Sequence, residues 1–118
     1  MNQIELMRNR NEIAQLIRIG NRHKNVLRWG SGETDEHIQM KLEICKYLKK
    51  LGEEFYTEPI FVDGSGRADI IASDRRQIIE VYNTETEKSL KEKKNKYPSG
   101  LEIIFVNANQ KFNEKLIL

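Results

Sequence analysis

Two stretches in the first half of the chain repeat apolar residues at the spacing of an α-helix. The first covers residues 3–19, and the pair Asn2 and Glu5 at its start has the spacing of a capping box. Residues 21–32 lose this periodicity, are basic and end in glycine and serine, so we expect a flexible connection with Trp29 as its anchor. A helix outside the main body is therefore predicted first.

The second stretch predicts a long helix over residues 35–51. Thr34 is a favourable N-cap, and Gly52 is placed to end the helix. Helical periodicity gives an inward stripe of His37, Met40, Lys41, Ile44, Leu48 and Leu51. The stripe is therefore polar at its N-terminal end and apolar at its C-terminal end.

Strand-like segments dominate the second half of the chain. Three of them, separated by turn residues, are predicted to form an antiparallel meander: residues 55–62, 67–73 and 76–82. Thr84 with Glu87 forms another capping box, which opens a helix that Pro98 ends. Residues 101–106 are a continuous apolar run typical of a buried strand. This order of elements predicts an α/β fold.

The hairpin between the second and third strands is predicted to bring two carboxylates together. If Asp74 and Arg75 form its turn, pairing outward from the turn sets Asp69 opposite Glu80. Both side chains would then project from one face of the sheet, with β-carbons roughly 5 Å apart. Like charges directly opposite destabilise a sheet. Either both are ordinary surface acids on a solvated hairpin, or a cation such as Mg²⁺ or Mn²⁺ compensates them.

The composition fits one globular domain. The 118 residues are 38% hydrophobic and 32% charged, which excludes a disordered chain. No apolar run approaches the roughly 20 residues that cross a bilayer, and no secretory signal is evident, so we expect a cytoplasmic protein without a membrane partner. Cys45 and two histidines are too few for a structural zinc cluster, so oxygen ligands would dominate any metal site.

Basic residues are concentrated in two segments. Residues 1–30 hold six lysines and arginines against two acids, and residues 88–96 hold five lysines against one acid. Such segments contact phosphates without reading base sequence, or they are simply solvated faces. The candidate nucleic-acid contacts in these segments are Arg22, Lys24, Arg28, Lys88, Lys91 and Lys94, with Arg67 as a further candidate on the hairpin.

The order of these motifs resembles the PD-(D/E)XK nuclease superfamily over residues 33–108. The motifs are a helix with an early Glu, Gly-Arg-Ala-Asp-Ile at residues 66–70, Ile-Ile-Glu-Val-Tyr at residues 78–82, a basic helix and a buried strand. The chain is particularly similar to small archaeal Holliday-junction resolvases and restriction-endonuclease-like proteins. This resemblance implies an αβββαβ core with a mixed central sheet flanked by helices in residues 33–118, preceded by an extra helix and basic linker in residues 1–32.

The resemblance also implies a metal site. In that superfamily the Asp and Glu of the second and third strands bind the ion, often with the carbonyl that follows the Glu. The matching positions are Asp69, Glu80 and Val81. An acid on the preceding helix completes the site, with Glu36 as first choice and Glu43 in reserve. Members of the RecB-like branch use a histidine there, which makes His37 a third candidate, unless it is only a polar residue at the helix start.

The chain departs from the family where it has Tyr82 in place of the motif lysine. A lysine steadies the attacking hydroxide and the developing phosphate charge, whereas Tyr82, the catalytic candidate at this position, offers one hydrogen bond. Lys41 on the inward stripe and Arg67, opposite Tyr82 in the predicted register, are the candidates for the missing cation. Each has the alternative of being a surface cation or part of a structural ion pair.

Together, the residues and the resemblance predict a metal-dependent endonuclease that hydrolyses DNA, either double-stranded or branched. A domain this small would act as a homodimer, and the first helix could supply the interface through Met7, Leu16 and Ile17, unless these pack on their own domain. The alternative is a catalytically impaired nuclease-fold protein that acts as a nucleic-acid-binding or assembly subunit. A further possibility is a subunit whose partner supplies the missing cation.

Overall fold

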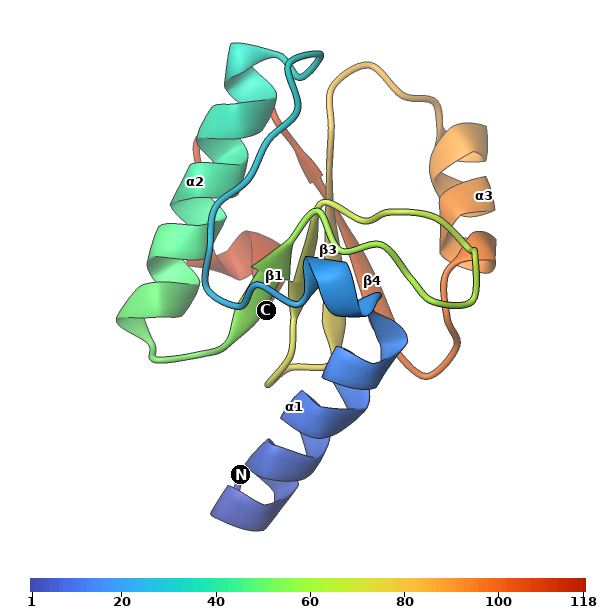
Figure 1. The fold of residues 1–118 in the computed structure, drawn as a ribbon. Helices are drawn as coiled ribbons and strands as arrows, with labels where there is room; N and C mark the ends of the chain where they lie inside the picture. Colours follow the sequence, from blue (N-terminus) through green and yellow to red (C-terminus); the bar gives the residue numbers. More distant parts are fainter.

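The computed structural model describes residues 1–118 and combines three α-helices with one four-stranded sheet (Figure 1). The helices are α1 (Gln3–Leu16), α2 (Asp35–Lys50) and α3 (Glu87–Lys96). The strands are β1 (Phe55–Thr57), β2 (Ile70–Ala72), β3 (Gln77–Tyr82) and β4 (Glu102–Asn107). Two short 3-10 helices lie at Ile19–Asn21 and Glu114–Ile117.

The sheet is mixed, with the strands in the order β1-β2-β3-β4. β1, β2 and β3 are antiparallel neighbours, which confirms the predicted meander. β4 lies parallel to β3, and the crossover that a parallel pair requires runs through α3. The chain therefore has the α/β class expected from its sequence. None of the helices combines the length and the apolar character needed to cross a lipid bilayer.

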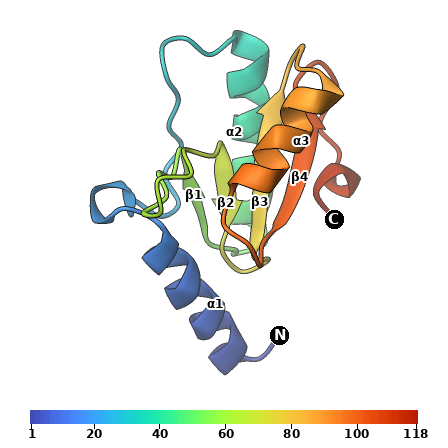
Figure 2. The ribbon, with the colours of Figure 1, turned by 90° about the vertical axis from the view of Figure 1, so that its right-hand side faces the viewer.

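Each face of the sheet has its own apolar core. α2 covers one face with Met40, Ile44 and Leu48, and α3 lies on the opposite face (Figure 2). The end of α1 adds Ile13 and Ile17 to the second core. Truncating one such buried aliphatic side chain to alanine typically costs about 2–5 kcal/mol. The two cores together hold β2 and β3 firmly between the helices.

α1 projects away from the rest of the molecule (Figure 2). Ile4 and Met7 on its N-terminal half are exposed, whereas Ile17 at its end is fully buried and Leu16 packs against the second core. Leu16 and Ile17 thus pack on their own domain, and only Met7 of the three predicted interface residues is exposed.

Three element boundaries differ from the prediction for local reasons. β2 covers Ile70–Ala72 instead of residues 67–73, because Arg67 forms only an isolated bridge with Ile60. α1 ends at Leu16 because Ile17 becomes extended and pairs with Phe61. β1 is shorter than predicted because Glu58 adopts a left-handed backbone conformation, with φ of 55°, and is followed by Pro59. The strand therefore cannot continue through these residues as regular β-structure.

Two further predictions about the helices need correction. The N-cap of α3 is Thr86, whose side chain accepts a hydrogen bond from Ser89 N, rather than Thr84. Leu51, assigned to the inward stripe of α2, lies just beyond the last helical turn and is exposed. The stripe therefore ends at Leu48.

Residues 21–32 are bound to the body instead of forming the flexible connection that was predicted. Asn25 N donates to the Phe55 carbonyl of β1 at 2.7 Å, and Leu27 packs against the α2-side core. Trp29 is exposed and is therefore not the anchor of this segment. Glycine and serine at the end of the segment suggested mobility, but hydrogen bonds along β1 fix its path.

Candidate functional site

Asp69 and Glu80 meet as the hairpin register predicted. Ile70 pairs with Ile79 in the antiparallel ladder, so the next pair outward is Asp69 and Glu80. Both side chains line one hollow of about 300 Å³ between the start of α2, the β2–β3 hairpin and α3. The two carboxylates therefore lie in one place rather than on opposite faces of the sheet.

Burial and a neighbouring acid favour the neutral form of Glu80, against the effects of Tyr97 and Lys93. The residue is 3% exposed, and burial, followed by the negative charge of Asp69, raises the pKa of Glu80 to about 8. Tyr97 Oη lies 2.7 Å from Glu80 Oε1 and 3.0 Å from the Arg67 carbonyl oxygen. One hydroxyl hydrogen cannot serve both acceptors. A protonated Glu80 satisfies both contacts, because it donates to the Tyr97 hydroxyl while this hydroxyl donates to the Arg67 carbonyl oxygen.

Asp69 is also largely buried but remains ionised. Burial acts to raise the pKa of Asp69, but the hydrogen bond and charge of His37, with the hydrogen bond from the Val81 amide, hold this pKa below its usual range. Val81 N lies 2.7 Å from Asp69 Oδ2. At neutral pH the pair therefore consists of an ionised Asp69 and a protonated Glu80, because their environments separate their pKa values.

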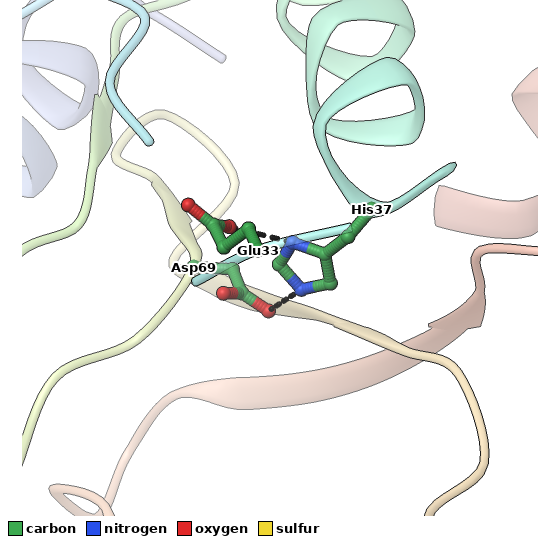
Figure 3. Close-up of side chains that lie close together, drawn as sticks. All are labelled: Glu33, His37 and Asp69. Atoms are coloured by element: carbon green, nitrogen blue, oxygen red, sulfur yellow. Dashed lines mark ion pairs between the residues drawn. The ribbon is translucent and has the colours of Figure 1, made fainter. Parts of the chain in front are cut away.

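His37 connects Asp69 to a second acid, Glu33 (Figure 3). His37 Nε2 lies 2.8 Å from the Val81 carbonyl oxygen and 3.4 Å from Asp69 Oδ2, while Nδ1 lies 2.6 Å from Glu33 Oε1. Glu33 is off the direction of the Nδ1 hydrogen, so this contact is an ion pair without an aligned hydrogen bond. The hydrogen bond to Asp69 raises the pKa of His37 against the opposing effect of burial. The two acids on either side therefore favour the protonated form of His37.

Lys41 is fully buried and does not line the hollow. Its Nζ lies 2.6 Å from Glu58 Oε1, 3.1 Å from Glu33 Oε1 and 2.8 Å from the Arg28 carbonyl oxygen. These three acceptors match the three hydrogens of an ammonium group, so none remains for a substrate. The geometry favours the structural ion-pair alternative for Lys41, which fixes two acids at the base of the site.

Arg67 and two lysines of α3 line the same hollow as the carboxylates. Arg67 Nε lies 2.8 Å from Glu58 Oε2, and its side chain remains largely exposed. Lys93 Nζ lies 2.8 Å from Glu85 Oε2. Burial lowers the pKa of Lys93, but the bond to Glu85 and the charge of Glu80 outweigh it and raise this pKa. Arg67, Lys93 and Lys96 are therefore the cations that face the carboxylates.

Glu36 and Glu43 do not reach the hollow. Both line a separate groove between α2 and the chain that follows β4. The difference is helical geometry, because Glu36 lies one position, and so about 100°, from His37 around the helix. The acid that reaches His37 is Glu33, which lies just before the N-cap Thr34.

Val81 and Tyr82 have backbone roles in the structure. The Val81 carbonyl, expected as a metal ligand, accepts a hydrogen bond from His37. Tyr82 is half-buried at the end of β3, does not line the hollow, and accepts a hydrogen bond from Ala108 N through its carbonyl at 2.7 Å. Neither side chain supplies the cation that the family pattern places here.

Arg67, one of the predicted nucleic-acid contacts, lines the hollow, and the other six lie on two exposed surfaces. Lys88, Lys91 and Lys94 are exposed on α3 but do not line the hollow. The others are exposed on the segment beside β1: Arg22, Lys24 and Arg28. The lysines of α3 that approach the carboxylates belong to a different side of that helix from the ones predicted.

Sequence reasoning missed Glu33, Glu58, Lys93 and Tyr97. Glu33 precedes an N-cap and Glu58 precedes Pro59, so both lie outside the regular elements whose periodicity was used. The lysines at 93 and 96 were counted within the basic segment, but helical phase alone does not tell which side of an apolar-poor helix faces the sheet. Buried Tyr97 just after α3 was the one available signal that the end of this helix approaches the core.

Comparison of the chain with protein-family models, curated proteins and solved structures finds no match. Its function is therefore inferred from the arrangement of its own residues. The informative features are the buried acid pair, the acid-bound His37 and the cations that line the same hollow.

Proposed function

We propose that this chain is a metal-dependent endonuclease that hydrolyses phosphodiester bonds in DNA. The observation that carries the proposal is the meeting of Asp69 and Glu80 in one hollow that Arg67, Lys93 and Lys96 also line. Carboxylate oxygens suit a hard divalent cation, and the flanking cations suit a phosphate. Few other substrates need both kinds of group within so small a space.

The residues present fit Mg²⁺ or Mn²⁺. The negative charge of Asp69 contributes to the raised pKa of Glu80, and a divalent ion held by both carboxylates would offset this repulsion. Glu33 and His37 each place a possible ligand atom within 4.8 Å of one on Asp69. Asp69 and Glu80 would hold the ion, and Glu33 is better placed than Glu36 to be the third acid. A bound ion would supply polarisation of the phosphate and activation of water.

The chain's own residues would then divide the remaining tasks. Lys93 and Arg67 would bind and orient the phosphate and stabilise the charge that develops on it. Lys93 is the better replacement for the missing motif lysine, because the charges of Glu80 and Asp69 act on it from within the hollow. Tyr97 would hold the Glu80 carboxyl in position through its hydroxyl. Proton exchange at Glu80 would accompany binding of the ion.

DNA, as duplex or branched substrate, and a homodimer complete the proposal. The exposed lysines of α3 would add phosphate contacts without reading bases. The exposed Ile4 and Met7 on the projecting half of α1 offer an apolar surface for a second copy. A second candidate function is a catalytically impaired nuclease-fold protein that binds nucleic acid. Two observations favour it: Tyr82 replaces the lysine, and the Val81 carbonyl is already bonded to His37.

Cleavage of plasmid and branched DNA in Mg²⁺ or Mn²⁺ separates these functions. We expect Asp69→Ala and Glu80→Ala each to reduce the rate about a thousandfold or more, and Lys93→Ala to reduce it about a hundredfold. Asp35→Ala and Glu43→Ala are the matched controls, because both residues are acids of α2 outside the hollow. Cleavage that survives substitution of both Asp69 and Glu80 would rule out the proposed site. A wild-type chain that binds DNA without cleaving it would favour the second function.

A further inference from the structure

A tryptophan stands exposed beside the candidate site. Trp29 is 55% exposed and is the single tryptophan of the chain. Large aromatic side chains contribute most to stability when they are buried. A tryptophan on the surface therefore loses much of that stabilising contribution. An exposed tryptophan on a fixed segment therefore points to contact with another molecule.

Hydrogen bonds fix the backbone on both sides of Trp29. Arg28 N donates to a threonine hydroxyl of β1 at 2.9 Å, and the Arg28 carbonyl accepts from Lys41 Nζ at 2.8 Å. On the other side, Gly30 N donates to the carboxylate of Glu33. Both anchors, Lys41 and Glu33, belong to the ion-pair network of the site. Trp29 is thus held at a defined position next to the acids that surround His37.

The segment that carries Trp29 is basic, and Lys24 at its far end lies 3.8 Å from Glu54 Oε1. Residues 18–32 include four lysines and arginines and no acid. Of these, Arg22, Lys24 and Arg28 are exposed on the same segment. An aromatic ring among cations is the arrangement that binds single-stranded nucleic acid, because the ring stacks on a base while the cations contact the backbone. The charge complementarity favours a polyanion over a neutral or basic protein partner.

We propose that Trp29 stacks on an unpaired nucleobase and thereby selects single-stranded or frayed nucleic acid for the neighbouring site. The inference rests on the proposed function, since the bound strand would be its substrate. In an intact duplex the base faces are covered by their neighbours and only the edges are open in the grooves. Trp29 would therefore engage a base only where the strand is unpaired, as at a junction, a flap or a single strand.

The fluorescence of Trp29 tests this directly because no other tryptophan contributes. The full chain is titrated in EDTA with a single-stranded oligothymidine, with an abasic strand of equal length and charge, and with a blunt duplex. We expect the oligothymidine to quench the emission, and the abasic strand and the duplex to leave it nearly unchanged. Equal emission changes with the abasic strand, or none with the oligothymidine, would contradict stacking.

Substitution at the same position gives an independent readout. Anisotropy of a labelled oligothymidine should show that Trp29→Ala weakens binding about tenfold or more, while Trp29→Tyr retains most of it. Binding of the abasic strand should be equal for all three proteins. Leu51→Ala, a change at an exposed apolar residue at the end of α2, is the matched control and should bind as the wild type does. An unchanged affinity in Trp29→Ala would overturn the inference.

Failure of this inference is distinguishable from failure of the proposed function. Binding is measured without metal, whereas cleavage depends on Asp69 and Glu80. Cleavage that requires both acids, combined with no response of Trp29, would reject the stacking role and leave the nuclease proposal intact. Quenching by unpaired bases in a protein that never cleaves would reject the nuclease proposal and keep the binding role.

Discussion

The carboxylates at the two ends of the β2–β3 hairpin differ in their hydrogen-bond partners. At the turn, Asp74 receives two hydrogen bonds from Arg10, at 2.7 and 3.0 Å. Glu53, beside the same turn, receives two from Arg75, also at 2.7 and 3.0 Å. Asp74 and Glu53 therefore each have their own guanidinium in the bidentate arrangement that pairs best with a carboxylate.

At the open end the acids have no such partners. Asp69 and Glu80 are both largely buried, no arginine is bonded to either, and the pKa of Glu80 rises to about 8. Arg67 lies nearby but is paired with Glu58. The comparison teaches that burial of acids alone does not mark a functional site. The distinguishing feature is a pair of adjacent acids without a guanidinium partner, whose pKa values are moved apart.

The largest expected effect on stability comes from breaking the network beneath the open end. Lys41→Met removes the ammonium shared by Glu33 and Glu58 and leaves two partly buried acids without it, so we expect a loss of about 3 kcal/mol. Urea unfolding measures the change. Lys46→Met, at a well exposed lysine of the same helix, should alter stability by less than about 0.5 kcal/mol. Equal stability of the two variants would show that Lys41 does not organise the site.

Breaking the pair at the turn should affect stability and not chemistry. Asp74→Asn weakens two charge-assisted bonds to Arg10, which we expect to cost about 2 kcal/mol in urea unfolding. DNA cleavage below the unfolding transition should stay at the wild-type rate. The control is Asp63→Asn on an exposed loop, which should change neither property. A large loss of cleavage in folded Asp74→Asn would remove the distinction between the two ends.

Glu80→Gln should stabilise the metal-free protein at high pH. The folded pKa of Glu80, about 8, lies above its ordinary value of 4.5, so the folded state keeps a proton that the unfolded state releases between these pH values. Wild-type stability therefore falls as pH rises from 4.5 to 8. Glutamine cannot ionise, so the variant should gain about 1–2 kcal/mol over the wild type at pH 8.5 and almost nothing at pH 4.5.

Unfolding by urea in EDTA at the two pH values measures this gain. Glu43→Gln is the matched control outside the hollow and should track the wild type at both. A Glu80→Gln protein that is no more stable than the wild type at pH 8.5 would mean that Glu80 ionises there without cost.

The sequence predicted the part of the site that depends on local rules. Strand alternation and a short turn were enough to place Asp69 opposite Glu80, because both act over a few residues. Glu33 and Glu58 could not be placed in this way, since each lies just outside a regular element and meets His37, Arg67 and Lys41 only through tertiary contacts. The choice of Glu36 as the third acid came from the family resemblance and not from helical phase.

On the second face of the sheet, sequence patterns again predicted the helix but not which of its side chains reach the site. The existence of α3 was predicted from capping residues and Pro98. Its few apolar residues did not indicate which side of the helix faces the sheet, so Lys88 and Lys91 were predicted as phosphate contacts and Lys93 was not. The path of residues 21–32 was also hidden, because hydrogen bonds to β1 fix it and these depend on tertiary contact. Periodicity identifies elements, whereas the groups that meet between elements are set by packing.

Titration of Mn²⁺ into the full chain by calorimetry at pH 8 tests most directly whether the open end of the hairpin is a cation site. The wild type and Asp74→Asn should each bind one Mn²⁺ at this site, and Asp69→Asn should lose that binding. Affinity for Mn²⁺ in the wild type should be weaker at pH 6.5, because a larger fraction of Glu80 is then protonated and must lose its proton before it can bind the ion. Absence of binding in the wild type, or equal binding in Asp69→Asn, would contradict the assignment of Asp69 and Glu80 as a metal-binding pair.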